Sequence, residues 1–188
     1  MVQKTDLRVI KTRKNLYESL IYLLKEKPFE EIKVSDICEH ALINRSTFYA
    51  HYQDKYELFD SFIKDLKESF RLELKKNKNI SNSKEYYIEM VKIFLNHVEE
   101  KKDIYFSIII NNKNSIIMDM IYETLNNDIK QSLDEDDNIK SNKIPSDIVT
   151  KFYLGAVFNV GMEWLRDNNS YTKQDIVNYL DKLIPDNI

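Results

Sequence analysis

The chain has 188 residues, a formal net charge of −3 and 43% hydrophobic residues, which is long enough for one large helical unit or two smaller ones. Only two Gly and three Pro accompany abundant Lys, Glu, Leu and Ile, a composition that favours an all-α protein over one rich in β-hairpins. A single Cys excludes an internal disulfide framework. Because there is no apolar signal core and no apolar run of about 20 residues, we expect a cytoplasmic protein without a membrane segment.

The first predicted helix spans residues 7–25 and has a broad apolar face. Its apolar residues are Leu16, Tyr17, Leu20, Ile21, Leu23 and Leu24. Charge is unevenly distributed, because residues 1–67 hold 12 Lys and Arg against 11 Asp and Glu, whereas residues 68–188 hold 16 against 20. The first cations are Lys4, Arg8, Lys11, Arg13 and Lys14. A basic edge of this kind attracts phosphate groups, although the same charges also suit a solvated helix turn.

Residues 34–55 have the pattern of two short helices joined by a tight connection. Ser35 is the expected N-cap of the first helix, and Asn44 is the expected N-cap of the second. Phe48 and Tyr52 are four residues apart, so they share the face of the second helix that we expect to pack inward. The residues left on its outward face are Arg45, Ser46, Thr47 and Tyr49.

These outward residues suit the DNA major groove, which admits one α-helix and meets residues near that helix's N-terminus. Arg can fork onto guanine, Ser and Thr can bond bases or phosphates, and Tyr can reach a phosphate or a thymine methyl group. Asp54 and Glu57 then form a predicted capping box for the next helix, with Lys55 in its first turn. Because the helix dipole disfavours a cation there, a nearby phosphate would compensate Lys55. The alternative is an ordinary helical hairpin without a DNA role.

Residues 48–59, Phe-Tyr-Ala-His-Tyr-Gln-Asp-Lys-Tyr-Glu-Leu-Phe, resemble the signature of tetracycline-repressor (TetR) family regulators. In that signature an aromatic-rich recognition helix ends in Tyr-x-His-aromatic, and a Lys and an apolar residue follow on the next helix. Residues 12–67 as a whole are similar to the family's three-helix DNA-binding domain, and residues 33–37 fit the start of its second helix. The local pattern and the resemblance together assign DNA contacts to Ser35, Arg45, Ser46, Thr47, Tyr49, His51 and Lys55. One departure is Leu42, which stands where the family usually has Gly and therefore predicts an altered or slightly strained turn.

The rest of the chain is also predicted to be helical. The expected helices are 55–76, 84–101, 104–110, 113–133, 145–166 and a last one opened by Thr172, with a polar break at 77–83 and a charged loop at 134–143. By composition the apolar run at 104–110 could also be a buried strand, but its helical neighbours disfavour this. We therefore expect a helix-turn-helix DNA-binding domain at 7–67 and an effector-binding and dimerisation domain at 68–188.

The predicted helix at 145–166 is apolar on nearly every side and contains both glycines, Gly155 and Gly161. Each Gly costs about 1 kcal/mol relative to Ala in a helix interior, so close approach of other helices is the expected reason for it. At about 100° per residue the two point about 120° apart, and one could face its own domain while the other faces a second subunit. With the last helix, this helix could build a four-helix bundle around a two-fold axis, which is also how TetR-like proteins dimerise.

A regulator of the resembled family senses a small molecule between its middle helices. Aromatic and sulfur-containing side chains are the candidate pocket walls, because ligand sites are mostly apolar with few polar groups. They are Tyr87, Phe94, His97, Tyr105, Phe106, Met118, Tyr122, Phe158, Met162 and Trp164. The same stripe at helical spacing also suits plain core packing, and His97 is more simply explained as a partly buried, hydrogen-bonded histidine.

An enzyme is not expected, because three His and one Cys lack metal-ligand spacing and no Gly-rich loop could hold phosphates. We therefore predict no catalytic residue, no metal site and no cofactor. The sequence predicts a homodimeric, ligand-responsive transcriptional regulator, with repression the expected mode, whose partners are a palindromic double-stranded DNA operator and an unknown small-molecule effector. The alternative is an all-helical small-molecule or protein-interaction module that does not use its helix-turn-helix on DNA.

Overall fold

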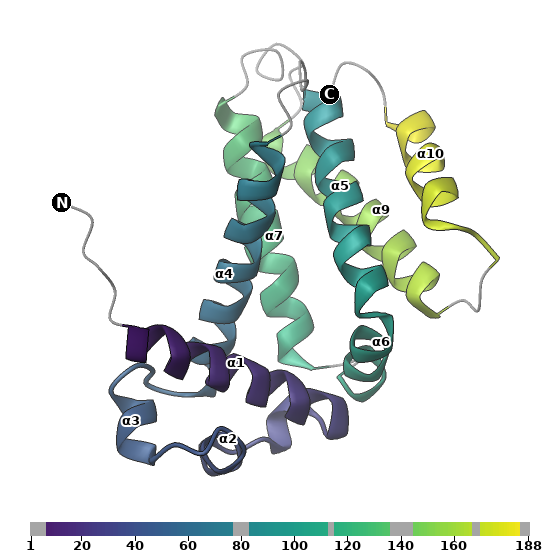
Figure 1. The fold of residues 1–188 in the computed structure, drawn as a ribbon. Helices are drawn as coiled ribbons and strands as arrows, with labels where there is room; N and C mark the ends of the chain where they lie inside the picture. The colour runs from purple at the N-terminus through teal and green to yellow at the C-terminus, as the bar shows by residue number, and fades with distance from the viewer. Residues whose placement is uncertain (1–6, 77–82, 113–114, 136–144, 167–169, 185–188) are drawn as a thin grey trace. The chain divides into compact units, whose positions relative to one another are not determined.

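The computed structural model describes residues 7–76, 83–112, 115–135, 145–166 and 170–184 (Figure 1). These residues form α-helices and one short 3-10 helix with no strand among them, so the all-α prediction is confirmed. The elements are α1 (Leu7–Glu26), η1 (Phe29–Glu31), α2 (Val34–His40), α3 (Arg45–Tyr49), α4 (Lys55–Leu74), α5 (Ser83–Glu100), α6 (Lys102–Asn111), α7 (Ile116–Glu135), α9 (Ser146–Arg166) and α10 (Lys173–Leu183).

Most predicted helix limits agree with the structure within a few residues. The apolar run at 104–110 lies in α6 and is helical, so the strand alternative is wrong. α9 begins directly after Pro145, whose carbonyl accepts the N–H groups of Ile148 and Val149 at 3.0 and 3.2 Å. The polar break predicted at 77–83 and the charged loop predicted at 134–143 lie largely outside the described residues.

The chain divides into two compact units that are not contiguous in sequence. The first unit contains residues 1–65 together with 107–120, and the second contains 66–106 together with 121–188. The first unit thus ends within α4, and residues 107–120 pack with the N-terminal helices. The predicted domain limits, 7–67 and 68–188, stay a prediction.

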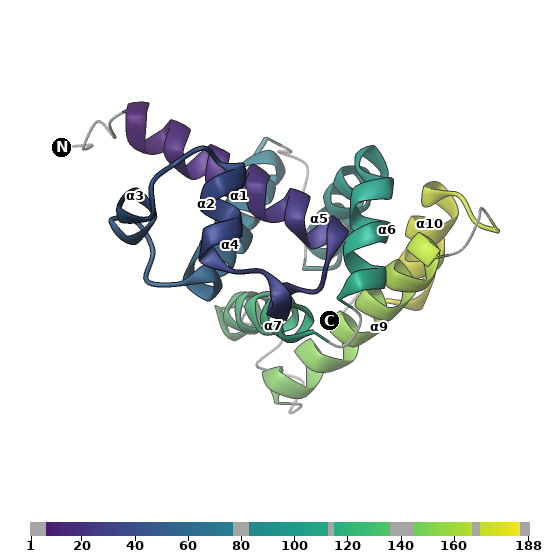
Figure 2. The same cartoon turned by 90° about the horizontal axis from the view of Figure 1, so that it is seen from below.

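The first unit has a core built around α1. Leu16, Leu20 and Leu24 of this helix are fully buried, because their spacing places them on one face. α1 packs on α2, and α2 packs on α3 (Figures 1 and 2). The other large side chains that are fully buried in this unit are Phe29, Ile32, Ile37, Phe48, Leu58, Phe59 and Ile117.

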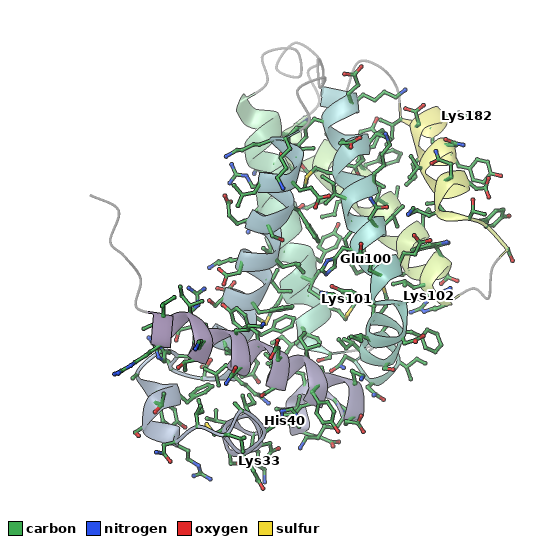
Figure 3. The ribbon with its side chains drawn as sticks, viewed as in Figure 1. Lys33, His40, Glu100, Lys101, Lys102 and Lys182 are labelled. Carbon is green, nitrogen blue, oxygen red and sulfur yellow. The ribbon has the colours of Figure 1, made fainter. Side chains whose placement is uncertain are left out.

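The N-cap predicted for α2 is wrong. The helix begins at Val34, so Lys33 is the N-cap and Ser35 lies inside the first turn. The Asp36 carboxylate accepts the Lys33 backbone N–H at 3.2 Å and also the Lys27 ammonium at 2.6 Å, and it thereby caps the helix without a Ser hydroxyl. Lys33, which precedes α2, and His40, its last residue, are both labelled beside this helix in Figure 3.

α2 ends in a Schellman motif with Leu42 in the left-handed conformation. The φ angle of Leu42 is 56°, so the strained turn predicted from the sequence is confirmed. The N–H of Leu42 donates to the Glu39 carbonyl at 3.2 Å, and the N–H of Ile43 donates to the Cys38 carbonyl at 3.0 Å. Leu42 is 91% exposed, so packing does not compensate for its backbone conformation.

In the second unit α5 packs on α10 (Figure 1). Buried apolar residues of this unit include Val91, Leu95, Val98, Leu154, Leu165, Ile176, Val177 and Leu180. Thr172, which was predicted to open the last helix, is the N-cap of α10, so that prediction is confirmed. It forms a capping box, in which Thr172 Oγ1 accepts the Asp175 N–H at 3.1 Å and Asp175 Oδ2 accepts the Thr172 N–H at 2.9 Å. None of the helices in the described residues is long and apolar enough to cross a membrane.

The two glycines of α9 have different surroundings, as their angular separation predicts. Gly161 is buried, and a Cβ atom placed on it would lie 3.8 Å from Cε1 of Phe94 on α5. A Cβ atom placed on Gly155 would have nothing within 4 Å. Gly161 thus faces its own unit, whereas Gly155 faces open space.

Candidate nucleic-acid interface

α3 has one side buried in the core and one side exposed to solvent. Phe48 is fully buried and Tyr52, just beyond the helix, is 6% exposed, so the predicted inward face is confirmed. Arg45, Ser46 and Tyr49 are exposed, the last by 58%, and Thr47 is half-buried. We call these four residues the outward face of α3. They carry one cation, three hydroxyl groups and an exposed aromatic ring.

An open groove of about 420 Å³ runs beside this outward face. It is lined by Ile32, Lys33, Val34, Ser35, Arg45, Tyr49, Asp54, Lys55 and Tyr56. The groove brings together four of the residues assigned to DNA contacts, which come from α2, α3 and the start of α4. Ser46, Thr47 and His51 do not line it.

Ser35 and His51 have local partners in the first unit. The Ser35 hydroxyl donates to Asp36 Oδ1 at 3.3 Å, and Ser35 is half-buried in the first turn of α2. His51 follows α3, is half-buried, and donates its backbone N–H to the Phe48 carbonyl at 2.9 Å. Its ring lies 6.3 Å from the Tyr52 ring, centroid to centroid.

The Lys55 ammonium has partners other than the phosphate that we predicted. It donates to the backbone carbonyls of Phe29, Glu30 and Ile32 at 2.7, 3.0 and 2.8 Å. It also lies 4.7 Å from the centroid of the Phe29 ring. These three carbonyls use all three ammonium donors, and they compensate for a cation at the N-terminus of α4. Burial lowers the pKa of Lys55, and the Glu30 carboxylate partly opposes that shift.

The predicted capping box of α4 is present in a modified form. Asp54 Oδ1 accepts the Glu57 backbone N–H at 2.8 Å, as expected. The Glu57 carboxylate reaches back one residue further than expected and accepts the Gln53 N–H at 2.6 Å. α4 therefore starts at a fixed place relative to the end of α3.

A polar network behind α3 joins α1 to α4. The Tyr17 hydroxyl lies 2.9 Å from Ser61 Oγ and donates to Asp65 Oδ2 at 2.9 Å. The Tyr52 hydroxyl in turn donates to the Tyr17 hydroxyl at 3.4 Å. Arg13 donates to Tyr17 at 3.1 Å and pairs with Asp65. Burial raises the pKa of the Tyr17 phenol above its usual range. Arg13, which we had counted in a basic edge, is thus engaged within the unit.

The candidate effector residues do not all lie in one unit. Met118 belongs to the first unit by its contacts, whereas the other candidates belong to the second. Phe106 is 39% exposed. Trp164 is buried and its indole N–H donates to the Tyr171 carbonyl at 3.1 Å, while the Lys102 ammonium lies 5.9 Å from its ring. Lys102 is labelled beside Lys101 and Glu100 at the α5–α6 junction in Figure 3.

His97 is a partly buried, hydrogen-bonded histidine, as the simpler explanation predicted. Its Nε2 lies 2.7 Å from the Tyr105 hydroxyl, and its ring contacts Phe70 edge to face at 5.1 Å. Burial lowers the pKa of His97, and the nearby Lys101 charge adds to this.

Within the described residues of the second unit, the buried Tyr87 hydroxyl on α5 and the buried Asn126 Oδ1 on α7 have no hydrogen-bond partner. The Tyr87 ring contacts the Tyr153 ring of α9 at 6.2 Å, and Tyr122, one turn before Asn126, contacts Phe158 of α9 at 6.1 Å. Sequence reasoning missed Asn126, because a lone Asn in a helix gives no signal of burial. Among the described residues no three His, Cys, Asp or Glu side chains are grouped as metal ligands.

Comparison with known proteins identifies the family. The model "Bacterial regulatory proteins, tetR family" matches residues 18–62, and the model "Transcriptional regulator C-terminal region" of the TetR type matches residues 85–186. An uncharacterized HTH-type transcriptional regulator of Bacillus subtilis, YxbF, is 35% identical over 51 residues, which are 27% of this chain and only 13% of that protein.

Solved structures agree in fold over nearly the whole chain. A TetR transcriptional regulator from Streptococcus agalactiae has a TM-score of 0.65 and 24% identity, with 95% of this chain and 96% of that chain covered. The regulator FadR from Bacillus subtilis, in complex with stearoyl-CoA, has a TM-score of 0.67 and 15% identity, with 93% and 98% covered. Since a family model spans more than half of the chain and a second matches the helix-turn-helix, this protein belongs to the TetR family of DNA-binding transcriptional regulators.

Proposed function

We propose that this regulator binds a roughly palindromic DNA operator as a homodimer and represses transcription until a small molecule binds its second unit. The observation that carries the proposal is the exposed outward face of α3, a helix whose opposite side is anchored in the core by Phe48. Two such helices, presented one helical turn apart, would enter successive major grooves. We further propose that it acts in the cytoplasm and that its role is regulatory, not enzymatic.

Arg45 is our candidate for reading bases. It is exposed, and its guanidinium has no hydrogen-bond partner in the described part of the chain, in contrast to the Lys55 ammonium. Ser46, Thr47 and Tyr49 are proposed to contact bases or phosphates beside it, and Ser35, His51 and the backbone at Lys55 are proposed to lie along the DNA strand.

Selection of duplexes from a random pool by the wild-type protein tests this proposal. We expect a selected site with two-fold symmetry whose binding weakens steeply as salt rises. Arg45→Ala is expected to cost about 1–3 kcal/mol on that site and to relax base preference at one position of each half-site. Equal weakening on all duplexes would assign Arg45 to phosphates. Absence of salt-dependent duplex binding would favour the alternative of an interaction module that does not use DNA.

The dimer is proposed to form through α9 and α10. On α9, Ile148 and Phe152 are 53% and 68% exposed, and they line up at helical spacing with the open side of Gly155. On α10, Tyr179 and Leu183 are 46% and 76% exposed. Large apolar side chains on the exposed faces of two terminal helices support association of two copies.

Sedimentation or light scattering tests the dimer. Phe152→Asp is expected to convert a dimer into a monomer, because it places a charge in the centre of the proposed apolar face. Leu72→Asp on α4 is the matched control, since Leu72 is a comparably exposed apolar residue at 54% outside that face. A Phe152→Asp protein that remains dimeric would exclude this face as the interface.

The effector is proposed to lie against α5, α7 and α9 in the second unit. Tyr87 and Asn126 supply buried polar groups without a partner, and Phe94, Tyr122, Phe158 and Met162 supply apolar surface. A buried polar group without a partner costs about 1–3 kcal/mol, so a ligand that bonds to these two atoms would gain affinity. We propose an uncharged or weakly polar organic molecule with an apolar body and hydrogen-bonding groups.

A further inference from the structure

The segment Phe29–Ile32, which we call the 29–32 turn, is held from one side by the start of α4. Its carbonyls at Phe29, Glu30 and Ile32 accept the three hydrogen bonds of the Lys55 ammonium. Lys55 and Ile32 both line the groove beside Arg45. The position of the turn therefore fixes part of the groove wall.

The same turn is held from its other side by residues more than 80 positions later in the sequence. We call Asn111, Asn112, Ser115 and Ile116 the α6–α7 junction. Asn112 Oδ1 accepts the Phe29 N–H at 2.7 Å, and Glu30 Oε1 accepts the Ser115 hydroxyl at 2.7 Å and the Ile116 N–H at 3.2 Å. Asn111 also donates its side-chain amide N–H to the Lys25 carbonyl at the end of α1.

Asn112 is a buried polar residue whose side-chain amide makes three hydrogen bonds. It is 1% exposed, and its Nδ2 donates to the carbonyls of Leu24 and Ile108 at 3.2 and 2.9 Å. Burying an amide costs free energy unless its hydrogen bonds are made, so this side chain has a specific geometric requirement. The Ser115 hydroxyl is likewise the main cause that lowers the pKa of the Glu30 carboxyl.

Phe29 and Glu30 are thus bonded on both sides. Phe29 donates its N–H to the α6–α7 junction and accepts a hydrogen bond from Lys55 at its carbonyl. Glu30 accepts a hydrogen bond from the junction at its carboxylate and one from Lys55 at its carbonyl. Hydrogen bonds weaken steeply once donor and acceptor separate beyond about 3.5 Å, so a displaced junction either carries the turn with it or breaks these bonds.

We propose that Asn112 and Glu30 are positioning residues for DNA binding, which set the 29–32 turn and through Lys55 the groove beside the outward face of α3. The inference rests on the proposed function, and it adds a route by which movement of α6 and α7 reaches the DNA-binding surface. Coupling by this route requires a second state of the turn in which these hydrogen bonds are broken.

The test uses the full-length protein and a duplex selected from a random pool by the wild type. Glu30→Ala removes the acceptor for Ser115 and Ile116 and is expected to weaken duplex binding about three- to tenfold. Glu30→Gln keeps an acceptor oxygen but no charge, and it is expected to bind like the wild type. Glu31→Ala is the matched control, because it removes an exposed carboxylate from the neighbouring position of the same turn. Equal effects of Glu30→Ala and Glu31→Ala would show that charge alone acts and would overturn the inference.

A second pair of measurements separates positioning from general damage. Ser115→Ala changes no charge, and its weakening of duplex binding is expected to disappear in a Lys55→Met background, because both changes act through one turn. Amide hydrogen exchange of the free Ser115→Ala protein is expected to speed up at residues 28–33. The proposed route would be refuted if the losses of duplex binding caused by Ser115→Ala and Lys55→Met were additive. It would also be refuted if amide exchange at residues 28–33 were unchanged. A wild type that selects no duplex would instead refute the proposed function, and the inference with it.

Discussion

Leu42 provides a test of how backbone strain is balanced in the helix-turn-helix. Its φ of 56° places a residue with a Cβ atom in the left-handed region, which costs about 1–2 kcal/mol. Since Leu42 is 91% exposed, replacing it by Gly removes almost no buried apolar area. The gain is offset by about 0.4–1 kcal/mol, because Gly gives the unfolded chain more freedom.

We therefore expect Leu42→Gly to raise the free energy of unfolding by about 0.5–1 kcal/mol. For a chain of this size the gain corresponds to an increase of about 1–4 °C in the melting temperature. Urea denaturation monitored by circular dichroism measures the first quantity, and a thermal scan measures the second.

Leu42→Ala is the control for this measurement, because Ala keeps the Cβ atom and so keeps the strain. Its stability is expected to lie within about 0.5 kcal/mol of the wild type. If Leu42→Gly proved no more stable than Leu42→Ala, the left-handed conformation would not be strained and the reasoning would be refuted.

Three further predictions concern the second unit. Burial lowers the pKa of His97, so the unfolded chain binds a proton more readily, and the free energy of unfolding should fall as pH drops below about 6.5. Urea titrations at several pH values measure this fall, which His97→Gln should lack. Gly161→Ala should raise the unfolding free energy by about 0.5–1 kcal/mol, because a Cβ atom meets Phe94 only at 3.8 Å, whereas Gly161→Leu should lower it. Tyr87→Phe should stabilise the free protein by about 1–3 kcal/mol, since it removes a buried hydroxyl without a partner, and a calorimetric scan that shows destabilisation would contradict this.

Local spacing was sufficient to predict the parts of the fold that depend on neighbouring residues. The inward face of α3 and the start of α10 after Thr172 follow from residues within five positions of one another, whereas the strained turn at Leu42 was expected from the resemblance to the TetR family. The two orientations of Gly155 and Gly161 also followed, because helix geometry alone fixes the angle between them.

Errors arose where distant segments decide the role of a side chain. Lys55 was predicted to need a phosphate, but the carbonyls of a turn 23 to 26 residues earlier surround its ammonium. Ser35 was predicted to cap α2, but the helix begins at Val34, and the Asp36 carboxylate accepts both the Lys33 N–H and the Lys27 ammonium. Asn112 gave no signal, since its partner Phe29 lies 83 residues away and an Asn is ordinarily a surface residue.

The residues around α3 that are buried in the core differ from those that are exposed, and this bears on how regulators of this kind diversify. Folding of the first unit depends on Phe48 and Tyr52, whereas Arg45, Ser46 and Tyr49 contribute little buried surface to it. Substitutions at these exposed positions are therefore nearly neutral for stability, because surface changes typically stay within about 0.5 kcal/mol. If these residues contact bases as proposed, a lineage can exchange its target sequence by a few point mutations without first acquiring a compensating change elsewhere in the molecule.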